Sequence, residues 1–212
     1  QRDAVRISTK GEGKQHADRD YFAYSVTAKN RESAIANVLR YYDAKNALVF
    51  CGTRAAVNDM TSRFNSKGFS VVALSGELSQ KERTNALQSL RNGNARICIA
   101  TDVAARGLDL PNLELVVHAD IPRSSQILLH RSGRTGRAGR RGVTALMVTK
   151  NARRRTEILF QHSKIKAKWL EPPTKEQILS RDNDRIVEHQ LFQDDVQQED
   201  LSVVQRILET YS

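Results

Sequence analysis

The segment RICIATDVAARG, residues 96–107, contains the pattern that decides the fold. Its first part, 96–100, is a short apolar run that does not alternate with polar residues, as expected of a strand buried on both faces of a sheet. Similar runs occur at 47–51 (ALVFC) and 114–118 (ELVVH). Because helical patterns separate these runs, the sequence predicts βαβ units, and hence an α/β fold with helices on both faces of a parallel sheet.

Predicted strands and helices alternate along residues 20–162. The strands lie at 22–27, 47–51, 69–74, 96–100, 114–118 and 143–148, and the helices at 31–42, 54–66, 79–92 and near 123–132. The helix at 79–92 has the clearest ends, because Ser79 and Glu82 have capping-box spacing and Gly93 follows its last residue. We therefore expect one α/β domain over 20–162.

The segments on either side of this domain give weaker patterns. Residues 1–19 are expected to be an interdomain linker or the remnant of a longer chain, because they contain neither a starting methionine nor an apolar signal core. Residues 163–212 predict a linker and a partly helical, acidic extension, with helical potential at 175–180 and 200–211. Two interpretations of the extension stay open: a solvated tail, which we prefer, or the beginning of a further helical element.

Charge is unevenly distributed along the chain. The formal net charge is +10, which is compatible with a polyanionic partner such as nucleic acid, or equally with a solvated basic surface. Residues 131–155 contain nine Lys or Arg and no acid, whereas 182–200 contain seven acids and one arginine. This segregation favours a dedicated basic face over a uniformly basic surface.

Composition also argues against several other classes of protein. No apolar run is long enough to span a membrane, so no membrane partner is expected. Cys51 and Cys98 lie in or beside apolar, strand-like runs, which fits a reducing cytoplasmic location. The five histidines show no metal-ligand spacing, so we expect no metal site on this chain.

Polar residues follow the predicted strands, where ligands of open α/β sheets bind. Gln80 and Arg83 lie one turn apart at the start of a helix, where an ordinary polar first turn is the alternative to a ligand contact. Asp102 and Asp109 follow the strand at 96–100. Their spacing fits a carboxylate that binds a ribose hydroxyl and fits a helix cap equally well. The edge as a whole favours phosphate groups.

The segment HRSGRTGRAGRRG, residues 130–142, concentrates arginines and glycines and contains no carboxylate. Arg131, Arg134 and Arg137 recur every three residues, which places them roughly on one face if the segment is helical. Glycine costs about 1 kcal/mol relative to alanine in a helix interior. Close approach to the backbone of this segment is therefore expected to matter more here than helix stability. A flexible basic loop is the alternative, but a loose loop needs no such regular spacing.

The sequence contains no phosphate-binding motif of the kind that holds a nucleotide. The GEGK segment at 11–14 is followed by Gln15 rather than Ser or Thr, and Ser8 stands where a Walker A sequence has its first glycine. No acidic cluster is placed to hold Mg²⁺ beside a phosphate-binding lysine.

Four segments together resemble the second RecA-like domain of DEAD-box RNA helicases, within helicase superfamily 2. The segment VFCGTR at 49–54 resembles motif IV, and Gln80 with Arg83 resembles motif IVa. ATDVAARGLD at 100–109 resembles motif V, and HRSGRTGR at 130–137 resembles motif VI. These motif sequences are similar to those of bacterial members linked to ribosome assembly and cold-shock RNA remodelling.

The resemblance implies roles for individual residues. Arg134 and Arg137 would face the γ-phosphate of ATP, with Arg137 as the arginine finger, and Asp109 would bind the ribose. Arg106 and His130 would hold the domain against the first RecA-like domain of the same chain. Contacts to the RNA backbone would come from Arg54, Gly76, Gln80, Arg83 and Thr101. ATP with Mg²⁺ would be bound mainly by the first domain, so this fragment alone would be inactive.

Three functional hypotheses follow. The first is an ATP-dependent RNA helicase that unwinds short duplexes locally, seen here as its C-terminal half. The second is a non-enzymatic RNA-binding module, against which the presence of Asp109, Arg134 and Arg137 argues. The third, a DNA-translocating relative, would be expected to have Gln in place of His130. A homodimer through the C-terminal region is a further hypothesis, because such a region follows this domain in some bacterial relatives.

Overall fold

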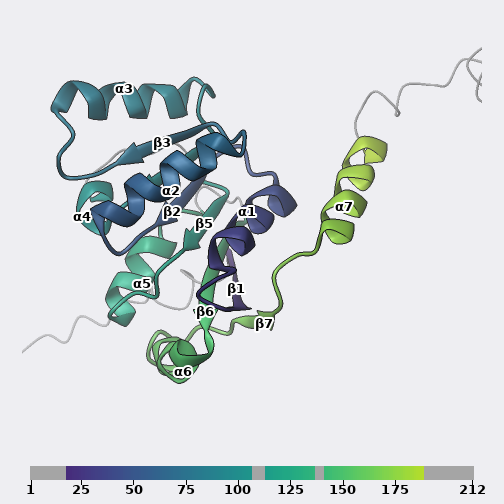
Figure 1. Cartoon of the computed structure of the whole chain (residues 1–212). Helices are drawn as coiled ribbons and strands as arrows, with labels where there is room; N and C mark the ends of the chain where they lie inside the picture. The colour runs from purple at the N-terminus through teal and green to yellow at the C-terminus, as the bar shows by residue number, and fades with distance from the viewer. Residues whose placement is uncertain (1–17, 107–112, 137–140, 189–212) are drawn as a thin grey trace, which may run out of the picture. The chain divides into compact units, whose positions relative to one another are not determined.

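The computed structural model describes residues 18–106, 113–136 and 141–188 of the chain (Figure 1). The strands are β1 (Arg19–Val26), β2 (Ala47–Phe50), β3 (Val71–Leu74), β4 (Ile97–Ala100), β5 (Leu115–His118), β6 (Gly142–Thr149) and β7 (Lys168–Leu170). The helices are α1 (Arg31–Tyr42), α2 (Arg54–Ser66), α3 (Gln80–Arg91), α4 (Asp102–Ala105), α5 (Ser125–Ser132), the 3₁₀ turn η1 (Lys150–Ala152), α6 (Arg153–His162) and α7 (Lys175–Glu188).

The strands form one parallel sheet in the order β3-β4-β2-β5-β6-β1-β7. Because every pairing is parallel, the carboxyl ends of the strands lie at one edge of the sheet and the amino ends at the other. The loops that follow the strands therefore share an edge, although they are far apart in the sequence. This confirms the expected α/β fold with a parallel sheet.

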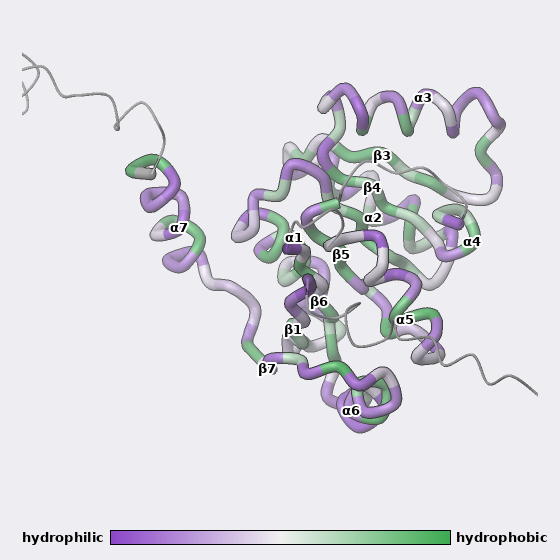
Figure 2. The backbone as a smooth tube through the Cα atoms, turned by 180° about the vertical axis from the view of Figure 1, so that it is seen from behind, coloured by the Kyte–Doolittle hydropathy of each residue, from purple (hydrophilic) through white to green (hydrophobic). Residues whose placement is uncertain are grey.

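Helices cover both faces of the sheet. Leu48 and Val49 of β2 point to opposite faces and both are completely buried, which explains why the strand sequences do not alternate. On one face the strands pack against α1 and α2, through residues such as Ile35 and Phe64. On the other face α3 and α4 cover one part of the sheet, and α5 and α6 cover the part around β1 and β6. In Figure 2 the hydrophobic colour follows the central strands, while α3 is mostly hydrophilic on the outside.

The helix ends agree with their sequence signals. α1 and α2 have the predicted bounds. The Ser79 hydroxyl accepts a hydrogen bond from the Glu82 backbone N–H, and the Glu82 carboxylate accepts from the Ser79 N–H, so the expected capping box is present. The Ser79 hydroxyl and the Ser79 backbone N–H both donate to the Glu82 carboxylate, and they lower the pKa of Glu82 because they favour its charged form.

The first compact unit extends beyond the expected boundary at residue 162. α6 ends there, but the chain continues to β7, which pairs with β1 and extends the sheet. This unit ends at Pro172. The sequence pattern does not predict α6, β7 or the single-turn helix α4. A three-residue strand such as KWL is too short to show a period in the sequence.

The second unit begins at Pro173. Its helix α7 begins where helical potential is expected at 175–180 and continues to Glu188. The first part of the acidic segment, 182–188, is therefore helical. The predicted helical element at 200–211 lies outside the described residues. None of the helices in the described parts is long and apolar enough to cross a membrane.

Candidate nucleotide and RNA interface

Arg131, near the end of α5, is the buried centre of the carboxyl edge. Its Nε and Nη2 donate to the two carboxylate oxygens of Asp102, at 2.6 and 2.7 Å. Its Nη1 donates to the backbone carbonyl of Asp120 at 3.0 Å, and its guanidinium carbon lies 4.8 Å from the centre of the Phe50 ring. One side chain thus holds together the loops that follow β4 and β5, and packs on the last residue of β2.

His118, the last residue of β5, completes the surroundings of Arg131. Its Nδ1 lies 3.4 Å from Arg131 Nη1, and its Nε2 has no hydrogen-bond partner among the described residues. Burial, reinforced by the positive charge of Arg131, holds the pKa of His118 well below its usual value. The ring is therefore neutral and can accept a hydrogen bond from Arg131 through Nδ1.

Asp120 connects the loop after β5 with the loop after β2. Its Oδ2 accepts a hydrogen bond from the backbone N–H of Gly52 at 2.7 Å, and its Oδ1 lies 2.8 Å from Nη1 of Arg31 at the start of α1. A Cβ at position 52 would lie 3.3 Å from Asp120 Oδ2, so a side chain there would strain this bond. The loop that resembles motif IV is thereby held against the segment that contacts motif VI.

Arg131 and Arg134 do not lie in one row on a helix, as their spacing suggests. α5 ends at Ser132, so Arg134 lies beyond the helix. Arg131 is 3% exposed, and all three nitrogens of its guanidinium form hydrogen bonds within the protein. Arg134 is half-buried, with Nη2 3.4 Å from Nε2 of His130. Arg131 therefore supports the site from inside, and Arg134 is nearer the surface.

The glycines of this segment also have a different reason from the one expected. Gly136 has a φ of +67°, and a Cβ there would lie 2.6 Å from the carbonyl oxygen of Asp18. A Cβ at Gly142 would lie 2.1 Å from the Thr135 hydroxyl. Both positions require glycine because the chain packs tightly against itself there, and not because a ligand approaches the backbone.

Two residues with an expected interdomain role lie together. Arg106 and His130 line one shallow hollow of about 230 Å³, with Asp102, Gln126 and Ile127. Both side chains are exposed, as a contact with another domain requires. Asp109 and Arg137, the residues expected at the ribose and the γ-phosphate, lie outside the described residues.

The residues expected to contact RNA follow β2, β3 and β4, which are neighbours in the sheet. Arg54 and Glu77 form an ion pair on the surface, with 59% and 65% of their side chains exposed. Gly76 is exposed, and a Cβ added there would have no atom within 4 Å. Gln80, which is exposed, and the partly exposed Arg83 lie in the first turn of α3.

Asp102 has neither of the two roles, ribose contact or helix cap, that the sequence leaves open for it. The Thr101 hydroxyl accepts a hydrogen bond from the Ala104 N–H at 3.4 Å and so caps α4. Asp102 is instead the partner of Arg131. Sequence reasoning assigns no bracing role to Arg131, Asp120 or His118. For His118 and Asp120 the only sequence signal is a polar residue at, or just after, the end of a buried strand.

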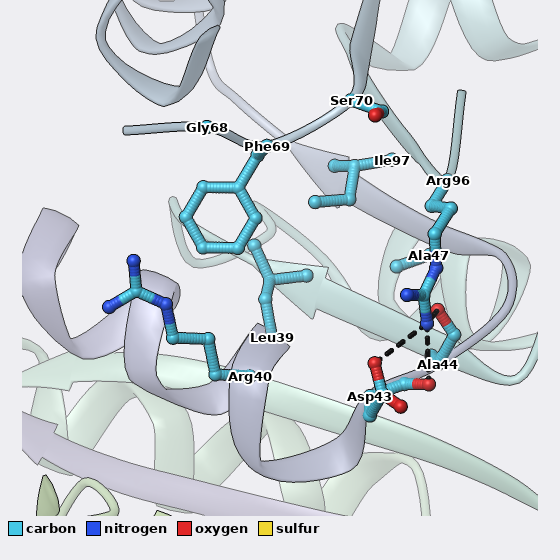
Figure 3. A pocket seen from close by; sticks show the side chains of 10 residues that line it. All are labelled: Leu39, Arg40, Asp43, Ala44, Ala47, Gly68, Phe69, Ser70, Arg96 and Ile97. Atoms are coloured by element: carbon cyan, nitrogen blue, oxygen red, sulfur yellow. Dashed lines mark hydrogen bonds and ion pairs between the residues drawn. The ribbon is translucent and has the colours of Figure 1, made fainter. Parts of the chain in front are cut away.

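A second hollow, of about 180 Å³, lies at the opposite edge of the sheet, near the amino ends of β2 and β4 (Figure 3). Arg96 crosses it to bind the carboxylate and the carbonyl of Asp43, which ends α1 with a φ of +44°. The Arg40 guanidinium lies over the Phe69 ring, 5.1 Å from its centre. None of the predicted site residues lines this hollow, so it is separate from the carboxyl edge. No group of three or more His, Cys, Asp or Glu among the described residues is placed to hold a metal ion.

This fold and this edge define the class of the protein as the C-terminal, RecA-like domain of a helicase. Residues 30–139 match the family described as the helicase conserved C-terminal domain. The chain belongs to this family, and its relatives are DEAD-box RNA helicases.

Two curated relatives show the extent of the similarity. The ATP-dependent RNA helicase DbpA of Escherichia coli is 34% identical over 155 residues, which are 73% of this chain and 34% of DbpA. The DEAD-box ATP-dependent RNA helicase CshA of Bacillus cereus is 30% identical over 188 residues, which are 89% of this chain and 35% of CshA. The chain thus spans about a third of the length of these relatives.

Solved structures agree with this assignment. A DEAD box protein from Methanococcus jannaschii matches with a TM-score of 0.67 and 28% identity, over 74% of this chain and 43% of that one. The Escherichia coli DEAD-box protein SrmB, solved bound to the regulator of ribonuclease activity A, matches with a TM-score of 0.64 and 29% identity, over 74% of this chain and 92% of that one.

Proposed function

We propose that this chain is the second RecA-like domain of an ATP-dependent RNA helicase, which closes with a first domain over ATP and RNA and unwinds short duplexes locally. The observation that carries the proposal is the Arg131–Asp102 pair. It joins the segment that resembles motif VI to the one that resembles motif V, so the segment from which the phosphate-facing arginines are expected is fixed to the loop after β4 that contains Thr101.

Each group of residues along the carboxyl edge of the sheet then has its own role. Arg134 and Arg137 stabilise the charge that develops on the γ-phosphate, and Asp109 binds the ribose. The first domain supplies most of the ATP site, with its Mg²⁺. Arg106 and His130 lie in a hollow that is open to a partner surface, which supports their role as interdomain contacts. An arginine finger contributes about 10³–10⁵ in rate.

RNA is held through its backbone. Arg54, Gly76, Gln80, Arg83 and Thr101 provide a guanidinium, an open backbone approach and hydroxyl or amide groups along the ends of neighbouring strands. Contacts of this kind reach phosphates and sugars rather than base edges, so binding is weakly sequence-specific and depends on salt. A cytoplasmic location and a part in ribosome assembly or cold-shock remodelling belong to the same proposal.

The experiment is ATP turnover by the longer protein that contains the first domain, with and without single-stranded RNA. Arg137→Ala and Arg134→Ala are compared with wild type, and Arg141→Ala serves as the matched control. Arg141 lies in the same basic segment, but it is 73% exposed and pairs with Asp20. We expect RNA to stimulate the wild type and the control, and Arg137→Ala to lose about 10³-fold or more.

Two results would contradict the proposal. Turnover that is indifferent to RNA and to Arg137→Ala would show that the arginines have no part in catalysis. RNA binding without any turnover would favour the alternative, a non-enzymatic RNA-binding module.

Self-association through the C-terminal region is a separate part of the proposal. On α7, Leu179 and Ile186 lie seven residues apart, and their side chains are 63% and 56% exposed, with Val187 beside them at 71%. Apolar residues at this spacing form one stripe along a helix, which suits pairing with another helix. Sedimentation of the wild type and of Leu179→Ser/Ile186→Ser tests this; a monomeric wild type would contradict it.

A further inference from the structure

The proposed function leaves half of the acid-free basic segment without a role. Residues 131–137 supply the arginines of the candidate site, but Lys150, Arg153, Arg154 and Arg155 follow β6 within six residues of one another. They occupy η1 and the first turn of α6, and all four side chains are exposed. Such a density of exposed cations requires an explanation of its own.

A hollow of about 280 Å³ lies beside these residues, at the carboxyl ends of β1, β6 and β7. Lys150, Arg153 and Trp169 line it, with Thr27 and Glu171 among its other residues. The Arg153 guanidinium stacks on the indole of Trp169, 4.4 Å from the ring centre. Figure 1 shows α6 and β7 next to one another at this end of the sheet.

The electrostatics of the segment are unfavourable in the isolated protein. The first turn of α6 contains no acidic residue, and neither Thr149 nor Ala152 caps its helix with a side chain. Cations beside a helix N-terminus are repelled by the helix dipole, which favours anions there. Glu157 offsets part of this charge by accepting from Arg153 Nε at 3.1 Å, whereas Lys150 and Arg154 have no ion pair within the described ranges. A bound anion would relieve this excess.

The hollow and the candidate RNA contacts lie at the same edge of the sheet. Because the sheet is parallel, the hollow lies at the same edge as Gly52, Gly76 and Thr101. Arg155 Nη2 donates to the carbonyl of Pro122 at 3.1 Å, in the loop that also contains Asp120. In the sheet order, β6 is two strands from β2 and β7 is four, so the hollow lies about 10–20 Å from the end of β2.

From these observations we infer that Lys150, Arg153 and Arg154, with Trp169, form a second binding surface for single-stranded RNA. This inference rests on the proposed function. A strand held at the ends of β2, β3 and β4 would run along the edge, and its next phosphates would reach these cations. Arg153 donates through Nε to Glu157, and its two terminal nitrogens can donate to phosphate oxygens while the guanidinium lies over the indole.

Trp169 provides a direct readout, because it is the only tryptophan of the chain. The 212-residue chain is titrated with single-stranded RNA of about 4 and of about 20 nucleotides, lengths that span roughly 14 and 70 Å at 3.4 Å per nucleotide. Both the Trp169 emission and the anisotropy of an end-labelled RNA are followed. We expect both RNAs to bind, with only the longer one also changing the tryptophan emission.

Two variants with equal charge loss separate this surface from general basicity. Lys150→Gln/Arg153→Gln/Arg154→Gln removes the proposed cations, whereas Lys45→Gln/Lys164→Gln/Lys166→Gln removes three exposed cations that precede β2 and β7, at the amino edge of the sheet. We expect the first variant to bind the longer RNA about tenfold more weakly. The slope of log affinity against log salt concentration should be smaller by about 2, since each lost phosphate contact contributes roughly 0.7 to it. Its affinity for the short RNA and the behaviour of the control should match the wild type. Circular dichroism confirms that both variants are folded.

The outcomes separate this inference from the proposed function. If the longer RNA binds equally well to wild type and to the first variant, the second surface does not exist, and the proposed function stands. If neither RNA binds wild type, both fail. If a polyglutamate peptide instead binds wild type and not the first variant, while RNA binding is unaffected, the surface is a docking site for acidic protein segments and the inference is overturned.

Discussion

Arg131 and Asp102 form a two-pronged ion pair across 29 residues of sequence, with N–O distances of 2.6 and 2.7 Å. The arginine is almost completely buried, and the carboxylate is about one-third exposed. The pair brings the end of α5 onto the loop after β4, and through the Asp120 carbonyl onto the loop after β5. A regularly spaced arginine in a segment expected to face phosphate is thus an internal brace.

We predict that Arg131→Lys destabilises the domain by roughly 3 kcal/mol, because a lysine cannot form the fork and leaves a half-buried carboxylate poorly paired. Urea unfolding measures the loss. Arg134→Lys is the matched control, since it changes a less buried arginine three residues away, and its cost should be below about 1 kcal/mol. Equal midpoints for wild type and Arg131→Lys would show that the pair does not support the fold.

We predict that Glu77→Gln strengthens RNA binding a few-fold. Glu77 holds the guanidinium of Arg54, one of the expected RNA contacts, and a carboxylate at this place also repels phosphate. Since both side chains are more than half exposed, breaking the pair should leave stability almost unchanged. RNA affinity measured at several salt concentrations tests this, with Glu32→Gln as the control because Glu32 pairs with Lys67 and Arg63 instead. Unchanged affinity in Glu77→Gln would remove Arg54 from the RNA contacts.

We predict that Gly76→Ala weakens RNA binding without affecting the free protein. A methyl group there meets no atom within 4 Å, so the unfolding temperature should be that of the wild type. If an RNA backbone lies against Gly76, the same methyl would obstruct it and lower the affinity about tenfold. Gly93→Ala is the contrasting variant: its φ of +75° makes alanine strained, so it should lose about 1 kcal/mol of stability and retain RNA binding. Full RNA affinity in Gly76→Ala would contradict the expected contact.

We predict that the domain loses stability between pH 7.5 and pH 5.5 because of His118. The folded state holds the pKa of His118 well below the value of about 6.5 expected when unfolded, so only the unfolded state takes up the proton in this range. The free energy of unfolding should therefore decrease as the pH is lowered from 7.5 to 5.5, by roughly 1 kcal/mol.

The His118→Gln variant keeps an acceptor for Arg131 but cannot titrate, so its unfolding free energy should vary less over the same range. His162→Gln, at the exposed end of α6, should retain the pH dependence of the wild type. A pH profile that is the same in His118→Gln and in the wild type would show that another group is responsible.

Local signals predict most of the elements correctly. The bounds of α1 and α2 and the capping box of α3 follow from apolar periodicity and from side chains within one turn of each helix end. Apolar strands without alternation predict a sheet covered on both faces, and the completely buried Leu48 and Val49 confirm it. The family follows from short motifs in which residue type and spacing are specific by themselves.

Other features depend on partners that are distant in the chain. β7 forms because the free edge of β1 offers hydrogen bonds to three residues that have no strand pattern of their own. Arg131 and Arg134 have the same chemistry in the same repeat, but α5 ends between them, and it is Arg131 that is buried against a carboxylate, a carbonyl and an aromatic ring. Asp120 likewise has a role only because β2 and β5 are neighbours.

The sequence by itself determined the parallel α/β architecture, the family and the set of residues available for phosphate and RNA. Burial period, helix capping and motif spacing are properties of neighbouring residues, so they can be deduced without the fold. Tertiary structure alone decided which arginine is the internal brace and which cations remain exposed along the carboxyl edge. Both outcomes depend on desolvation and on partners that are distant in the chain. Asp102 and Asp120 hold Arg131 inside the domain, whereas Pro122 and Trp169 contact Arg155 and Arg153, which remain exposed.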